Sequence, residues 1–101
     1  MKKCTIRNDL NKLREICKAI NALGKDEPSP LREQLREQLQ HRRDKLLDKY
    51  QKSILALDTM ENLIFTLYYL QGMTQREVAL KTNYCESSIT KHLSFIVEKM
   101  K

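Results

Sequence analysis

The chain has 101 residues, of which 41% are hydrophobic and 32% charged, and its formal net charge is +6. This length allows one domain, or one small domain with a helical arm, and only a modest core. No apolar run approaches the roughly 18 residues of a membrane-spanning helix. Because Gly and Pro are few and helix-forming residues dominate, we expect an all-α protein.

The cysteines and histidines do not form a recognisable metal site. Cys4, Cys17 and Cys85 include no C-x-x-C pair, and His41 and His92 are not at zinc spacing from them. The odd number of cysteines and the lack of a signal peptide favour the reducing cytoplasm. We expect buried or half-buried free thiols, and no metal, cofactor or small-molecule ligand.

Residues 1–57 predict a two-helix arm. In the first helix, over about 5–23, apolar residues alternate at spacings of four and three, a narrow coiled-coil-like stripe that favours a homodimer. A linker over 24–29 follows, with Gly24 as C-cap and Ser29 as N-cap of a second helix over 30–57. The first stripe is Ile6, Leu10, Leu13, Cys17 and Ile20, and the second helix is lined by Leu31, Leu35, Leu39, Leu46, Tyr50, Ile54 and Leu57.

A third helix is expected between Asp58, a good N-cap, and Gly72, a good C-cap. Apolar residues surround most of this helix, which therefore should be buried on most sides. We expect it to pack against the second helix or against a second subunit.

Residues 74–100 predict two short helices joined by a tight turn. Thr74 and Glu77 form a capping box, and the small Ala79 permits a close helix crossing. Asn83 tolerates the left-handed backbone of the turn, whereas Cys85 is a poor N-cap for the second helix. With the preceding helix, this motif completes a tri-helical helix-turn-helix unit over 58–101.

The outer face of the second motif helix carries short or hydrogen-bonding side chains, which suit contacts with duplex DNA. Free N–H groups at the start of the first motif helix suit a phosphate. The expected base-reading residues are Glu86, Ser87, Thr90 and Lys91. The expected phosphate contacts are Thr74, Gln75, Arg76 and Ser94, with Arg42 and Arg43 of the arm as further candidates.

Two stretches resemble known DNA-binding families. Residues 68–79, Tyr-Tyr-Leu-Gln-Gly-Met-Thr-Gln-Arg-Glu-Val-Ala, look like the promoter-reading C-terminal domain of sigma factors. Residues 89–100 are similar to the recognition helix of LuxR-type regulators, although no Arg is present there. An arm before such a reader resembles small phage-encoded, sigma-like regulators of the ArpU type. This resemblance implies a sequence-specific transcription regulator encoded by a phage or mobile element, with residues 86, 87, 90 and 91 facing bases.

The charge distribution complicates this reading. Residues 1–57 hold 14 Lys and Arg against 8 Asp and Glu, whereas residues 58–101 hold 5 of each. A neutral reader cannot depend on counterion release alone, so dimerisation, the 42–45 basic cluster or RNA polymerase must assist. That cluster also fits a solvated helix face. The alternative function is a helical protein–protein adaptor that docks on polymerase. Without a nucleophile–base pair or a Gly-rich phosphate loop, we do not expect an enzyme.

Overall fold

The computed structural model describes residues 3–24 and 29–100, and for residues 3 and 4 only the backbone. The elements are α1 (Lys3–Leu23), α2 (Pro30–Lys49), α3 (Gln51–Leu55), α4 (Thr59–Phe65), η1 (Thr66–Leu70), α5 (Gln75–Thr82) and α6 (Glu86–Lys99). Every element of this described part is helical, which confirms the all-α prediction. None of the described helices is both long and apolar enough to cross a membrane. Most of the expected 24–29 linker, residues 25–28, lies outside the described residues.

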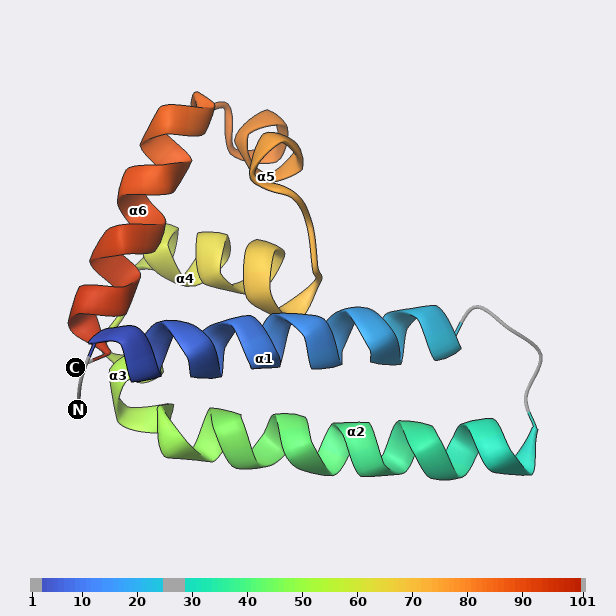
Figure 1. The fold of residues 1–101 in the computed structure, drawn as a ribbon. Coiled ribbons are helices and arrows are strands. Elements are labelled where there is room, and N and C mark those ends of the chain that lie inside the picture. Colours follow the sequence, from blue (N-terminus) through green and yellow to red (C-terminus); the bar gives the residue numbers. More distant parts are fainter. Residues whose placement is uncertain (1–2, 25–28, 101) are drawn as a thin grey trace.

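Helix α1 runs through the middle of the molecule. Figure 1 shows α2 antiparallel to α1 on one side, and α4, α5 and α6 on the other. The predicted stripe of α1, from Ile6 to Ile20, is fully buried, with Ile6 at 0% exposure. Its members Ile6, Leu10, Leu13 and Cys17 share one core with residues of α4, η1, α5 and α6. The stripe that favoured a dimer is therefore covered within the chain, by α2 as well as by the C-terminal half.

The second helix is shorter than predicted, because α2 ends at Lys49 instead of continuing to residue 57. Tyr50 is buried at the break, with φ −109° and ψ 13°, and its hydroxyl donates a hydrogen bond to Asp9 of α1. Lys49 Nζ also lies 2.7 Å from Asp9 Oδ2. These long-range bonds hold the chain against α1 and let it turn into the short α3, which sequence periodicity could not indicate.

Helix α2 is also less buried than its leucine pattern predicted. None of its residues is fully buried. Leu31 is 80% exposed and Leu35 48%, whereas Leu46 and Leu47 pack partly against the core. The end of α2 near residue 30 thus presents apolar side chains to solvent.

The third predicted helix begins as expected, since the Asp58 side chain accepts the N–H of Glu61. The last turns, residues 66–70, are wound as a π-helix, and Gly72 follows in the left-handed region at φ 72°. The expectation that this helix packs on the second helix is wrong: η1 packs mainly on α1, and α4 on α6. Burial on most sides is achieved within one chain, with Ile64 and Phe65 at 0% and 1% exposure.

Candidate nucleic-acid interface

Helices α5 and α6 form the predicted helix-turn-helix. The Thr74 N–H donates to Glu77 Oε1 at 3.3 Å and the Glu77 N–H to Thr74 Oγ1 at 3.2 Å, so the capping box is confirmed. Asn83 adopts the expected left-handed conformation, with φ 62°. Val78 and Ile89, both at 0% exposure, close the core between the two helices. Local sequence thus fixes the start of α5, the turn and the buried face of α6.

The outer face of α6 carries the predicted base-reading residues. Glu86, Ser87, Thr90 and Lys91 are all exposed, whereas Ser94 is half-buried on the flank nearer α1. Opposite them, Ile89, Leu93, Ile96 and Val97 are buried. The candidate readers therefore share one solvent-facing surface.

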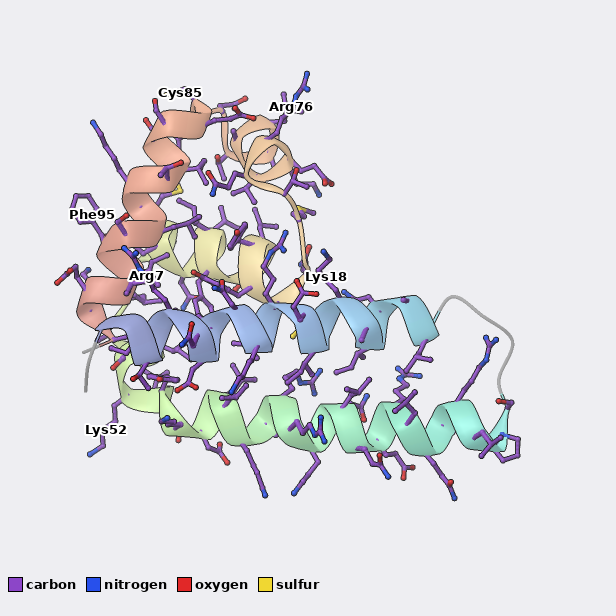
Figure 2. The ribbon with its side chains drawn as sticks, viewed as in Figure 1. Arg7, Lys18, Lys52, Arg76, Cys85 and Phe95 are labelled. Atoms are coloured by element: carbon purple, nitrogen blue, oxygen red, sulfur yellow. The ribbon has the colours of Figure 1, made fainter. Side chains whose placement is uncertain are left out.

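The beginning of α5 lies beside this surface. Thr90 Oγ1 is 2.7 Å from Gln75 Oε1, a hydrogen bond that joins α6 to the first residue of α5. Because the first backbone bond of this turn is made by the Val78 N–H to Thr74 O, the N–H groups of Gln75 and Arg76 have no carbonyl partner inside the helix. Arg76 is exposed and extends from the molecule (Figure 2). The structure thus brings Thr74, Gln75 and Arg76 together with the α6 face.

The Arg42–Arg43 pair does not join this surface. Both residues belong to α2, which is separated from α5 and α6 by α1 (Figure 1). Arg43 Nε lies 3.2 Å from Asp44 Oδ1, and Arg42 lines a hollow between α1 and α2 together with Lys45. A single duplex seated on α6 therefore has α1 between it and these two arginines.

Cys85 is exposed, which contradicts the expectation of buried or half-buried thiols; Cys17 is buried as expected, and the Cys4 side chain lies outside the described residues. Cys85 stands at the N-cap of α6 without making a capping hydrogen bond. Its Sγ lies 3.1 Å from Ser87 Oγ and 3.2 Å from Ser88 Oγ. Hydrogen bonds from Ser87 and then Ser88 lower the pKa of the Cys85 thiol to about 7. The sequence predicted that Cys85 is a poor N-cap, but it did not indicate the contacts with Ser87 and Ser88 that lower the pKa of the thiol.

A second surface on α6 was not predicted. The Tyr84 and His92 rings lie 5.4 Å apart, and the His92 and Phe95 rings 6.4 Å apart, in a row along the helix. Phe95 is 56% exposed and Tyr84 38%. Leu80 of α5, at 73% exposure, adds to the exposed apolar area of this unit. We call Tyr84, His92 and Phe95 the aromatic row.

Within residues 3–24 and 29–100, no group of three or more His, Cys, Asp and Glu side chains is arranged to hold a metal ion. The arrangement offers hydrogen-bond donors, a few cations and an exposed helix face, and these groups can bind a surface. No protein-family model, curated protein or solved structure matched the chain when it was compared with them. The chain is all-α, with a helix-turn-helix of α5 and α6 packed on a hairpin of α1 and α2.

Proposed function

We propose that this protein is a sequence-specific, double-stranded-DNA-binding transcription regulator of the sigma-like type, encoded by a phage or mobile element and acting in the cytoplasm without catalysis. The observation that carries the proposal is the exposed α6 face, where Glu86, Ser87, Thr90 and Lys91 follow a capped and tightly turned α5. Such an exposed helix has the dimensions to enter the major groove. Short hydroxyl side chains and one Lys can hydrogen-bond base edges there.

The test is selection of bound duplexes from a random pool, followed by titration of the selected site. Lys91→Ala should weaken binding to that site by ~1–3 kcal/mol, since a base contact of this kind is lost. The matched control is Lys52→Ala, which removes an exposed Lys of α3 that points away from α6 (Figure 2). Equal affinities of both variants and the unmodified protein would remove Lys91 from the reading surface. Failure to select any duplex would refute DNA recognition itself.

A protein–protein adaptor is the second candidate, and the aromatic row favours it. Exposed Leu80, Tyr84 and Phe95 are apolar enough to dock on another protein. On this alternative, genomic fragments should show no gel shift even at low salt. Phe95→Ala should then abolish binding to the partner, for which we propose RNA polymerase, while Lys91→Ala should leave it intact. Polymerase contact is also compatible with DNA reading, because it would hold a weakly charged reader at its site.

We further propose a homodimer, now through α2 and not through α1. Leu31 and Leu35 are four residues apart, so they share one face of α2, and both are exposed. Light scattering at micromolar concentration should show about twice the chain mass of 12.0 kDa. Leu31→Asp with Leu35→Asp should return the monomer without altering helix content. A species of the chain mass alone in the unmodified protein would contradict the dimer.

A further inference from the structure

A polar hollow of about 200 Å³ lies where α1 meets the helix-turn-helix. Arg7 and Asn11 of α1 line one side of it, and Gln75, Thr90 and Ser94 of α5 and α6 line the other. Tyr68 and Tyr69 of η1 also contribute to its wall, and no Asp or Glu does. Figure 2 shows Arg7 between α1 and α6. The hollow therefore lies beside the predicted base-reading residues of α6, and α1 contributes Arg7 and Asn11 to the same surface.

Within the described residues, the side chains of Arg7, Asn11 and Ser94 around this hollow donate to no protein acceptor. Gln75 Oε1 accepts from Thr90, which leaves its amide NH₂ to donate elsewhere. Within the described part of the chain, Arg7 lies within 4.0 Å of no carboxylate, and its guanidinium is close enough to Tyr69 to oppose the rise that burial causes in the pKa of that phenol. A guanidinium, two amides and a hydroxyl with no carboxylate nearby form a set that favours an anion.

The position of α1 beside the helix-turn-helix is fixed, so this hollow does not depend on a loosely attached arm. About two turns further along the same side of α1, the Arg14 guanidinium donates a hydrogen bond to Met73 O at 3.0 Å. It also lies over the Tyr68 ring, with Cζ 4.4 Å from the ring centroid. Asn21 Nδ2 lies 3.5 Å from Gln71 O. The spacing of residues 7, 11, 14, 18 and 21 places all five on one side of the helix. Arg7 and Asn11 are thus presented by the same face that holds the segment before α5.

We propose that this hollow receives a backbone phosphate of the DNA whose major groove holds α6, with Arg7 as its charged contact and Asn11, Gln75 and Ser94 as hydrogen-bond donors. The inference rests on the proposed DNA binding and deepens it. It adds positive charge beside residues 58–101, whose equal numbers of acidic and basic residues give no net charge. It also replaces Arg42 and Arg43 as the basic contribution of the N-terminal half, because those residues lie beyond α1.

The test measures binding of a fluorescent duplex of random sequence over a series of salt concentrations. Arg7→Gln should weaken binding about tenfold on any sequence, and should lower the slope of log affinity against log salt by about 0.9, the value for one phosphate contact. The matched control is Lys12→Gln, which makes the same charge change on α1 but on the side that faces α2. Thermal unfolding of both variants should match that of the unmodified chain, since Arg7 is exposed.

Four outcomes are distinguishable. Loss of affinity and slope in Arg7→Gln alone supports the phosphate site. Equal losses in Arg7→Gln and Lys12→Gln show a general charge effect and overturn it. If the unmodified protein binds but Arg7→Gln behaves identically, the phosphate site is wrong while DNA binding stands. If the unmodified protein binds no duplex at low salt, the proposed function fails first.

Discussion

Substitution of Gly72 by Ala tests the packing between α1 and the segment before the helix-turn-helix. Its φ of 72° is left-handed, and a Cβ built there would lie 2.5 Å from Lys18 Cγ. For Ala, the left-handed backbone costs about 1–2 kcal/mol. Displacing the middle of the Lys18 side chain from its rotamer costs about 0.5–1.5 kcal/mol more. Gly72→Ala should therefore lower the free energy of unfolding by about 1.5–3.5 kcal/mol, or on the order of 10 °C in Tm.

The two costs can be separated by a double-mutant cycle in urea followed by circular dichroism. In a Lys18→Ala background the clash is absent, so Gly72→Ala should cost only the backbone contribution, and the coupling should be about 0.5–1.5 kcal/mol. Gly24→Ala is the matched control, because Gly24 is not left-handed and its added Cβ would meet nothing nearer than 3.6 Å. That change should be neutral or slightly stabilising. Equal effects of the two glycine substitutions, or no coupling to Lys18, would refute this account.

Three further outcomes are expected. Leu10→Ala should cost ~2–5 kcal/mol in one cooperative transition, whereas Leu55→Ala, at a position that is 75% exposed, should stay within about 0.5 kcal/mol. Separate transitions for the two halves would contradict a shared core. Thr74→Ala should cost about 1 kcal/mol in urea unfolding, and no loss would show that the capping box is dispensable. Alkylation of Cys85, followed by peptide mass spectrometry, should accelerate as pH rises through about 7, because only the thiolate reacts. Ser87→Ala should move that midpoint upward, and an unchanged midpoint would assign the low pKa elsewhere.

What could be predicted from the sequence is what short-range chemistry determines. The Thr74–Glu77 capping box, the left-handed Asn83 and the Asp58 N-cap each depend on residues within three positions, and all three are confirmed. The α1 stripe was also correctly placed on one buried face, because helical periodicity alone selects it. Nothing in that periodicity states whether the covering surface is another chain or a later part of the same one.

Two of the departures arise from contacts between distant residues. The second helix stops at Tyr50 because that side chain bonds Asp9, some forty positions earlier. Arg42 and Arg43 lie apart from α6 because α1 lies between α2 and α6. Arg7 lies beside α6 because it belongs to α1. From the sequence alone, a basic segment looks the same whether it lies on one side of α1 or on the other. Only the docking of α1 decides which cations can meet a ligand of α6.

The central position of α1 also has a consequence for biosynthesis. A ribosome makes Ile6, Leu10, Leu13 and Cys17 first, but much of the core that they share, from Ile64 to Met100, emerges last. The nascent hairpin of α1 and α2 therefore cannot complete its core until nearly the whole chain has left the exit tunnel. A product that terminates early would expose a continuous apolar stripe, the feature that chaperones and proteases recognise. We therefore expect chains that lack α6 to be degraded, so that the molecules that remain carry the helix on which the proposed function depends.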